Sequence, residues 1–298
     1  MKTLAISVRV SIYLLCIYSL QATAFGKPNS ILKRLQSQTS TSEEVLISSF
    51  NIQIFGRSKS SKPDVMTELS KILNRSQLSF IQEIRDKSGG SMKRLLERVN
   101  MDNRHKYELA VSEPLGRSNS TEQYAYLYDD RSLDLLAIQT YPEIADEFER
   151  EPYLALWQVK GGQRFVTIGL HARPSDVDAE LAELQTVVSY VKELWNEESI
   201  IIMGDLNADC DYYNPEAQGF ENIHEDIEIW IDNNTDTTVS NSHCSYDRFL
   251  TLGPIEDHIN KAEVFNFEKE LGLSHELARK VSDHYPIDMV LSLSLIHI

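Results

Sequence analysis

An apolar run that stops at a glycine constrains the fold of this chain more than any other feature of the sequence. Residues 200–204 read IIIMG, and the next polar side chains are Asp205 and Asn207. A run of this kind, rich in β-branched residues, is typical of a strand that is buried on both faces. Polar residues that begin where the strand stops lie at its carboxyl end, where sheets often carry their chemistry. Asp205 and Asn207 are therefore candidate functional residues.

Strand-like and helical patterns alternate over the rest of the chain. Runs typical of strands occupy residues 45–50, 78–82, 124–128, 153–159, 164–171, 199–204, 248–252 and 287–293. Helical spacing predicts a helix over 176–195 with Ser175 as its N-cap, and a second helix after Pro63. The apolar faces consist of Leu181, Leu184, Val188, Val191 and Trp195 in the first and Val65, Leu69, Ile72 and Leu73 in the second. Because strands and helices are mixed along the whole chain, we expect one α/β domain with at least one large sheet.

The amino terminus has the three-part pattern of a secretory signal peptide. Residues 1–24 contain two basic residues, an uncharged apolar stretch too short to span a bilayer, and small residues that end at Ala24. Residues 25–44 are polar and rich in serine and threonine, so we expect a flexible extension there. The folded domain is expected over 45–293, with a tail at 294–298. The mature protein is accordingly expected to be secreted.

The charge and the cysteines limit what the mature protein can bind. A formal net charge of −16 keeps the chain soluble and repels polyanions, so contact with nucleic acid would need local arginines and bound cations. Cys210 and Cys244 remain after the signal peptide is removed, and an even pair in a secreted protein suggests one disulfide, with free thiols as the alternative. Asn74, Asn119 and Asn233 begin N-glycosylation sequons.

Several predicted strands end in, or lie beside, residue types that bind metals or move protons. They are Asn51, Glu83, His171, Asp205, Asn207, Asp247, Asp283 and His284. Any one of them has a simpler interpretation, as a turn residue or a hydrogen-bonded structural histidine. The whole set is harder to explain in that way, because buried charges are costly unless they pair or bind a metal.

These groups together suit phosphodiester cleavage by water. Carboxylate and amide oxygens without a cysteine ligand favour Mg²⁺, Mn²⁺ or Ca²⁺. Two histidines, each held by a carboxylate, can serve as a general base and a general acid near neutral pH. The cation and the asparagines would stabilise charge on the phosphate while the histidines handle the protons.

The motifs of the chain resemble, in order, those of the deoxyribonuclease I family, within the endonuclease/exonuclease/phosphatase superfamily. The strings that carry the resemblance are SFNIQIFG, FIQEIRD, VSEPLGR, EQYAYLY, FEREP, LHARPSD, MGDLNADC, CSYDR and SDHYP. The resemblance implies a four-layer αββα sandwich, in which helices flank two packed mixed β-sheets. It also implies divalent-cation-dependent endonucleolytic cleavage of double-stranded DNA that leaves 5′-phosphate ends.

The resemblance also implies roles for individual residues. Glu83 is similar to the metal-binding carboxylate of the family, and Asn51, Asp205, Asn207 and Asp283 lie near it. The resemblance pairs His171 with Glu122 and His284 with Asp247, and it leaves open which histidine is the acid. Arg85 and Arg150 match arginines that approach the DNA backbone.

Mg²⁺ or Mn²⁺ is the cofactor that the resemblance implies for catalysis, and Ca²⁺ the structural ion. Cys210 and Cys244 fall on the disulfide positions of the family. The alternating side chains of one loop are similar to its calcium site, with a plain polar loop as the alternative: Asp236, Thr238, Ser240 and Ser242. Asp146 and Glu151 are candidates for a second calcium site, in a loop that lacks the cysteine-bridged turn of the family.

The sequence departs from the family pattern at two DNA-contacting positions. Gln53 stands where the pattern often has arginine, and Ser120 where a tyrosine often enters the minor groove. Losing a cation and an aromatic contact should weaken duplex binding or change its sequence preference. Asn119 lies three residues before Glu122, so we expect its sequon to be unmodified or to point outward.

Three other functions compete with this interpretation. An abasic-site endonuclease usually has QET where this chain has QEIR and works inside cells, and a sphingomyelinase would need an apolar membrane-facing insertion that the sequence lacks. A non-catalytic protein that keeps the fold for an actin-like partner would be expected to have lost some of Glu83, His171, Asp205 and His284, yet all are present. We therefore expect a monomer that binds double-stranded DNA and no membrane, with no sequence support for actin. This interpretation requires His171 and His284 to face one pocket.

Overall fold

The computed structural model of the protein describes residues 43–102, 104–117, 121–143 and 145–293. The predicted signal peptide, nearly all of the predicted extension and the predicted tail lie outside the described residues. The first strand begins at Glu43, two residues before the predicted start of the domain. Within the described ranges, no helix combines the length and the apolar character that a membrane span requires.

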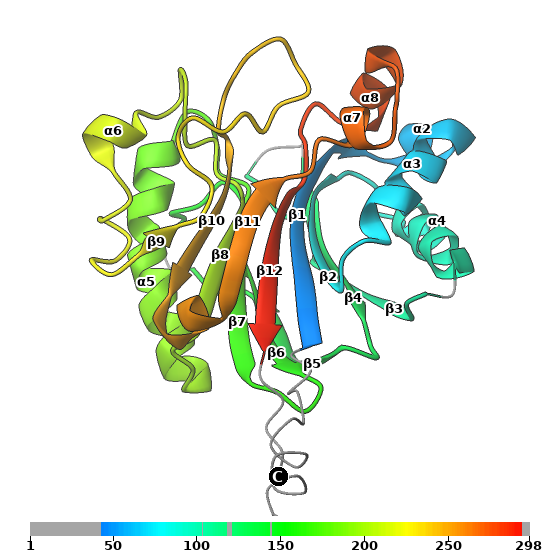
Figure 1. The fold of residues 1–298 in the computed structure, drawn as a ribbon. Coiled ribbons are helices and arrows are strands. Elements are labelled where there is room, and N and C mark those ends of the chain that lie inside the picture. The colour runs from blue at the N-terminus through cyan, green and yellow to red at the C-terminus, as the bar shows by residue number, and fades with distance from the viewer. Residues whose placement is uncertain (1–42, 103, 118–120, 144, 294–298) are drawn as a thin grey trace, which may run out of the picture. The chain divides into compact units, whose positions relative to one another are not determined.

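Two six-stranded sheets form the centre of the fold (Figure 1). In spatial order, the first sheet contains β11 (Ile259–Val264), β12 (Ile287–Leu293), β1 (Glu43–Phe55), β2 (Leu78–Ile84), β4 (Gln123–Asp129) and β3 (Tyr107–Val111). The second contains β5 (Leu133–Thr140), β6 (Tyr153–Val159), β7 (Arg164–Gly169), β8 (Ile200–Asp205), β10 (Asp247–Leu252) and β9 (Glu228–Ile229). Both sheets are mixed, because β1 pairs with β2 and β7 with β8 in parallel, whereas the other pairs are antiparallel.

Helices cover the outer face of each sheet (Figure 1). The first sheet is covered by α3 (Pro63–Leu73), α4 (Gly90–Val99) and α8 (His275–Val281), and the second by α5 (Val177–Trp195). The shorter elements are α2 (Arg57–Ser60), α6 (Pro215–Gln218), α7 (Phe267–Glu270), η1 (Asn100–Asp102) and η2 (Gly253–His258).

Three buried apolar clusters hold these layers together. One lies between the sheets and contains Phe80 and Trp157, one joins α5 to the second sheet, and one joins α3, α4 and α8 to the first. Three apolar interfaces between successive layers define four layers, since each sheet and each helix has to bury its apolar face against another element. The predicted αββα sandwich is confirmed.

Strand alternation places the functional candidates at the edge of the central cluster. In β8, Ile201 and Met203 point into the cluster between the sheets, whereas Ile202 contacts the α5 side. Asp205 follows at the same spacing of two and therefore continues the inward face. Gly204 precedes it with φ +151°, and a Cβ at this glycine would lie 1.7 Å from the carbonyl oxygen of Leu170. Only glycine permits this close approach of the two backbones.

The predicted elements are present, with one local error and several omissions. All eight predicted strands occur, and the two predicted helices correspond to α5 and α3. The N-cap prediction is wrong: α5 begins at Val177, and its N-cap is Asp176 rather than Ser175, without a side-chain capping bond. The strands that the sequence did not reveal are β3, β5, β9 and β11, which are the four edge strands of the two sheets.

Candidate active site

Two carboxylates are cross-strand neighbours at one end of the second sheet. Asp205 ends β8 and Asp247 begins β10, and the two are direct partners in the antiparallel ladder. Both are buried, at 2% and 0% exposure. Like charges directly opposite one another repel, and burial strengthens that repulsion, so this position needs positive charge or bound cations close by.

Two histidines supply hydrogen-bond partners for these carboxylates. Nδ1 of His171 lies 3.1 Å from Oε2 of Glu122, and Nδ1 of His284 lies 2.8 Å from Oδ2 of Asp247. Nε2 of each ring lies 3.5 Å from the same atom, Oδ2 of Asp205. The two Nε2 atoms are therefore separated by no more than twice that distance. The structure brings both histidines to one carboxylate oxygen, so the two rings are close enough to act on a single phosphate, as the sequence interpretation requires.

The electrostatics of the site follow from burial and from these pairs. Burial disfavours the Glu122 carboxylate, but the hydrogen bond from His171 and the charges of Arg150 and Arg85 outweigh it and lower the pKa of Glu122 to about 2. Burial also opposes protonation of His284, yet the carboxylates of Asp247 and Asp205 raise the pKa of its imidazole. The His284 ring thus carries a proton more readily than a free histidine.

Asn51 joins Glu83 to the central carboxylates. Its Nδ2 donates to Oε1 of Glu83 and to Oδ2 of Asp205, both at 3.0 Å. The backbone around it is strained: Gln53, Ile54 and Glu83 have φ values of +42°, +48° and +59°. Left-handed conformations of residues other than glycine cost on the order of 1–3 kcal/mol each, so the surrounding contacts have to stabilise them. Such outliers cluster at functional sites.

The two predicted DNA-contacting arginines lie beside Glu122. Arg85 donates to Oε1 of Glu122 at 2.6 Å, and its side chain is 32% exposed. Arg150 is buried and donates through Nε and Nη2 to the carbonyl oxygen of His171 at 3.1 and 2.9 Å. Arg85 can therefore reach a ligand at the surface, whereas Arg150 mainly fixes the His171 backbone.

Two predicted site residues make contacts away from Glu83. Nδ2 of Asn207 donates to the carbonyl oxygen of Ala172 at 2.9 Å, and its backbone N–H donates to Oδ1 of Asp205 at 3.1 Å. Asp283 accepts at 2.8 Å from Nε2 of Gln53, the residue that stands where the family pattern has arginine. Gln53 thus binds a site carboxylate of its own protein.

The donor set fits a hard divalent cation. Ligand atoms of Asp205, Asp247 and His284 lie within 4.8 Å of one another, and Glu83 approaches the same centre through Asn51. Oδ1 of Asp247 and Oδ1 of Asp283 are buried without a hydrogen-bond partner. A buried carboxylate oxygen without a partner is costly, and a cation is one group that would satisfy it.

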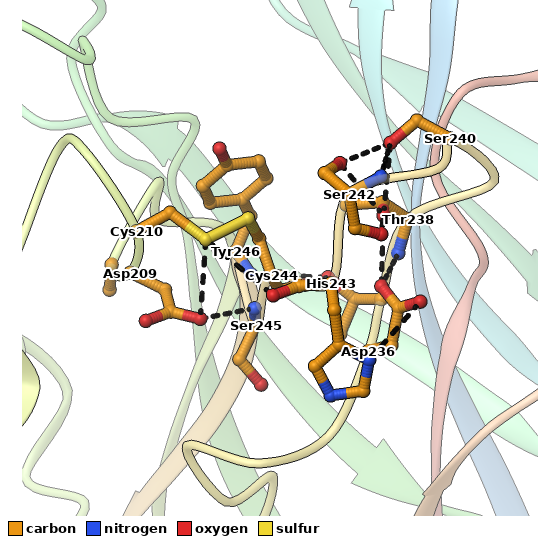
Figure 2. The surroundings of a disulfide bond; sticks show 12 residues. Asp209, Cys210, Asp236, Thr238, Ser240, Ser242, His243, Cys244, Ser245 and Tyr246 are labelled. Atoms are coloured by element: carbon orange, nitrogen blue, oxygen red, sulfur yellow. Dashed lines mark hydrogen bonds and ion pairs between the residues drawn. A yellow bond between two sulfur atoms is a disulfide. The ribbon is translucent and has the colours of Figure 1, made fainter.

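A disulfide closes the loop between β8 and β10 (Figure 2). Cys210 and Cys244 are bonded, with their Cα atoms 5.9 Å apart, so the predicted disulfide is confirmed. Oδ2 of Asp209 accepts from the backbone N–H of Ser245 at 2.7 Å and ties the two sides of the bridge together. The disulfide therefore fixes the segment that leads into Asp247.

Inside the loop that this disulfide closes, shortly before Cys244, the oxygen atoms of four side chains come together. Figure 2 shows Asp236, Thr238, Ser240 and Ser242 turned toward one another. Oδ1 of Asp236 accepts from the backbone N–H and from Oγ1 of Thr238 at 3.0 and 2.8 Å, and Oγ of Ser240 donates to Oγ1 of Thr238 at 3.3 Å. These hard oxygen donors are of the type that binds Ca²⁺.

The same loop pairs with the segment that carries His284. Thr238 and His284 form an antiparallel bridge, and the backbone N–H of Val239 donates to the carbonyl oxygen of Asp283 at 2.8 Å. The position of one catalytic candidate thus depends directly on the order of this loop.

The described residues include the second predicted calcium position and two of the three sequons. Asp146 forms an ion pair with Arg117 at 3.0 Å, and Oε2 of Glu151 is buried without a hydrogen-bond partner. Asn74 is 3% exposed, and its Nδ2 donates to Ser70, whereas Asn233 is partly exposed. Asn119 and Ser120 lie outside the described residues.

Sequence reasoning missed two residues that support the site. Tyr124 accepts from the backbone N–H of His171 at 2.9 Å. Gln82 accepts from the backbone N–H of Asp205 at 2.7 Å and donates to Ser49 at 2.9 Å. The signal was present, since Gln82 is a polar residue that continues the inward-facing series of Leu78 and Phe80 in β2.

The chain is similar to known proteins over most of its length. The Endonuclease/Exonuclease/phosphatase family matches residues 48–284. Deoxyribonuclease-1 of Equus caballus is 35% identical over 260 residues, which cover 82% of this chain and 91% of that protein. Deoxyribonuclease-1-like 2 of Homo sapiens is 32% identical over 296 residues, covering 89% of this chain and 98% of that protein.

Solved structures of the same superfamily share this fold. An endonuclease/exonuclease/phosphatase family protein from Bacteroides thetaiotaomicron superposes with a TM-score of 0.60 at 14% identity, covering 84% of this chain and 97% of that chain. At this identity the likeness concerns the fold. Together with the sequence matches, it means that the chain belongs to the deoxyribonuclease I family within the endonuclease/exonuclease/phosphatase superfamily.

Proposed function

We propose that this protein is a secreted, divalent-cation-dependent endonuclease that hydrolyses phosphodiester bonds of double-stranded DNA and leaves 5′-phosphate ends. Relatives named deoxyribonuclease-1, of which the chain covers about nine tenths, support the reaction class. One observation carries the proposal: both imidazole Nε2 atoms face a single oxygen of Asp205, while carboxylates hold their Nδ1 atoms.

The paired histidines would move the two protons of hydrolysis. One imidazole accepts the proton of the attacking water, and the other donates a proton to the 3′ oxygen as its bond to phosphorus breaks. Glu122 and Asp247 each fix the orientation of one ring through its Nδ1 atom, and Asp247 also favours the protonated form of His284. The geometry allows either assignment, because each Nε2 is equally close to Asp205.

Glu83 and Asp205 would hold the catalytic Mg²⁺ or Mn²⁺, with Asp283 as a further candidate ligand. Such an ion, when bound, stabilises the charge that develops on the phosphate oxygens. Asp247 and His284 have ligand atoms within 4.8 Å of Asp205, but they bind each other and would serve proton transfer instead.

Asn51 would orient the carboxylates of Glu83 and Asp205, because its amide hydrogens are donated to both. The backbone strain around it supports a role in function, since strain of this kind persists where function needs it. Asn207 would orient Asp205 through its backbone N–H.

DNA would be held through its backbone and minor groove by a small number of cations rather than by the protein as a whole. Arg85 is partly exposed beside the site and can neutralise a phosphate, and Arg150 supports the same side of the pocket. We expect weak, salt-sensitive binding of the duplex, because Gln53 supplies no charge and instead binds Asp283. Asp236, Thr238, Ser240 and Ser242 would hold a structural Ca²⁺, and the protein would act as a monomer.

The test is incubation of the purified mature protein with supercoiled plasmid, with and without EDTA. We expect nicked circles followed by linear DNA, loss of activity in EDTA, and ends that a ligase can rejoin because they carry 5′-phosphate. Sphingomyelin vesicles and a duplex with one abasic site are tested in parallel. Choline phosphate release, or cleavage confined to the abasic site, would replace the proposal with one of its rivals, and no cleavage of any substrate would point to a binding protein.

A further inference from the structure

The strand that carries Asn51 continues through an irregular stretch before it ends. The pairing of β1 with β2 shifts its register between Asn51 and Phe55. Within this stretch Gln53 and Ile54 are both left-handed, and Ile54 is β-branched, a type that rarely adopts this conformation. Because this stretch departs from the regular ladder, its N–H and C=O groups need other hydrogen-bond partners.

The N–H groups of this stretch bind the side chains of the site. The N–H of Gln53 donates to Oδ1 of Asn51 at 2.9 Å, and the N–H of Ile54 donates to Oε2 of Glu83 at 2.9 Å. Nδ2 of Asn51 in turn donates to Oε1 of Glu83 at 3.0 Å. The side-chain orientations of Asn51 and Glu83 therefore depend on the backbone position of Gln53 and Ile54.

The carbonyl groups of the stretch bind one buried lysine. Nζ of Lys59, in α2, donates at 2.8 Å to the carbonyl oxygen of Ile52 and at 2.8 Å to that of Gln53. Lys59 is 8% exposed. Burial lowers the pKa of its ammonium to about 8, and the nearby carboxylates of Asp283 and Glu83 oppose that shift. A buried ammonium is unfavourable unless its contacts compensate, and here they go to two strained peptide groups.

We propose that Lys59 is a positioning residue for the active site: by binding two carbonyl groups of the strained stretch, it holds Asn51 and Glu83 in the orientation that the phosphate and its cation require. Lys59 touches neither reacting group. It acts through the backbone, in the way that supporting residues orient metal ligands in other proteins. The inference rests on the proposed function of Asn51 and Glu83 and names a residue outside the set that the sequence indicates.

The test is Lys59→Met, which keeps an unbranched side chain of similar length and removes the ammonium donors. Lys62→Met is the matched control, because Lys62 is an exposed lysine three residues away. Mn²⁺ binding is measured by electron paramagnetic resonance without DNA and with Ca²⁺ saturating, and plasmid nicking gives kcat and KM. We expect Mn²⁺ affinity and kcat to fall about 10- to 100-fold in Lys59→Met, with KM for DNA changed less than about twofold and the control unchanged.

A second variant covers a failure of Lys59→Met to fold. Lys59→Cys is alkylated under denaturing conditions in the mature chain, whose other cysteines form the disulfide, and then refolded. 2-Bromoethylamine restores an ammonium at nearly the same reach, and a propyl halide gives a neutral side chain of equal length. We expect the aminoethyl form to regain Mn²⁺ affinity and kcat and the propyl form to remain impaired.

Three outcomes would overturn the inference: wild-type Mn²⁺ affinity in folded Lys59→Met, recovery in the propyl form, or loss of the melting transition in Lys59→Met and in both alkylated forms. Failure of the proposed function is a separate result. A wild-type protein that binds Mn²⁺ but cleaves no plasmid disproves the endonuclease while Lys59→Met still reports on positioning. A wild-type protein that cleaves plasmid, with normal Mn²⁺ binding in Lys59→Met, disproves only the positioning.

Discussion

Asp205 and Asp247 are direct partners in the β8–β10 ladder, so two buried carboxylates share one end of the second sheet. His284 lies between them and binds both, which relieves their repulsion and raises the pKa of its imidazole. We predict that Asp247→Asn lowers the pKa of His284, since one of the two charges that hold its proton is removed. Titration of the His284 ring by NMR in metal-free protein measures this shift, and an unchanged pKa would contradict it. The same variant should lose at least about a hundredfold in nicking rate.

Replacement of either site histidine should remove proton transfer. We expect His171→Ala and His284→Ala each to lower the nicking rate at least about a hundredfold, at unchanged folding. His275→Ala is the control, because His275 also pairs with a carboxylate, that of Glu268 at 3.0 Å, but at an exposed position. The measurement is initial nicking rate with circular dichroism as the folding check. Near-normal rates in either site variant would rule out the paired mechanism.

Glu122 should make stability depend on acid. Its pKa in the folded protein is lowered to about 2 from an ordinary value of 4.5, so the carboxylate stabilises the fold above pH 4.5. That contribution is lost as the pH falls from 4.5 through about 2, because the unfolded chain takes up the proton first. Urea unfolding across this range should show a steeper fall of the unfolding free energy in wild type than in Glu122→Gln. Parallel curves would contradict the prediction.

Calcium at the loop of Asp236, Thr238, Ser240 and Ser242 should raise the melting temperature before any substrate is present. At a hundredfold excess over Kd, a bound ligand adds about 3 kcal/mol, which corresponds to about 5 to 10 °C for a domain of this size. We expect EGTA to remove this gain in wild type and to have no effect on Asp236→Asn. Asp232→Asn is the control, because Asp232 stabilises a neighbouring turn through Thr235 outside the oxygen cluster. A melting curve unaffected by EGTA in wild type would exclude the site.

The disulfide should stabilise the domain mainly through its unfolded state. A bridge between residues 34 apart contributes about 4 kcal/mol in the chain-entropy estimate. We expect the double variant Cys210→Ala/Cys244→Ala to lose about this amount in denaturant unfolding. Reduction of wild type should give the same loss, and it should leave the double variant unaffected.

The sequence predicts the interior of this fold better than its borders. Central strands such as β8 are buried on both faces, so they appear in the sequence as continuous apolar runs. The missed strands β3, β5, β9 and β11 are the edges of the two sheets, with half-exposed residues and no long apolar run. An edge strand pairs on one side only and has little surface to bury, so its sequence is constrained less.

The site divides in the same way. The sequence reveals the acid–base residues because each lies in a short motif with a typical residue pattern: His171, His284, Glu122 and Asp247. The structure brings them together as two pairs. Lys59 is not recognisable, because its role depends on the left-handed backbone of Gln53. Backbone conformation of that kind is imposed by tertiary contacts and leaves no pattern of periodicity.

The place of β12 in the first sheet has a consequence for how the protein is made. β12 lies between β11 and β1, and it pairs with the opening strand residue by residue, from Ser49 with Ile287 to Glu43 with Leu293. A chain emerging from the ribosome therefore lacks one neighbour of β1, and the support that β12 gives to the His284 segment, until translation has passed residue 293. A copy that ends before β12 should be inert rather than partly active, so nuclease activity should appear only after β12 has been made.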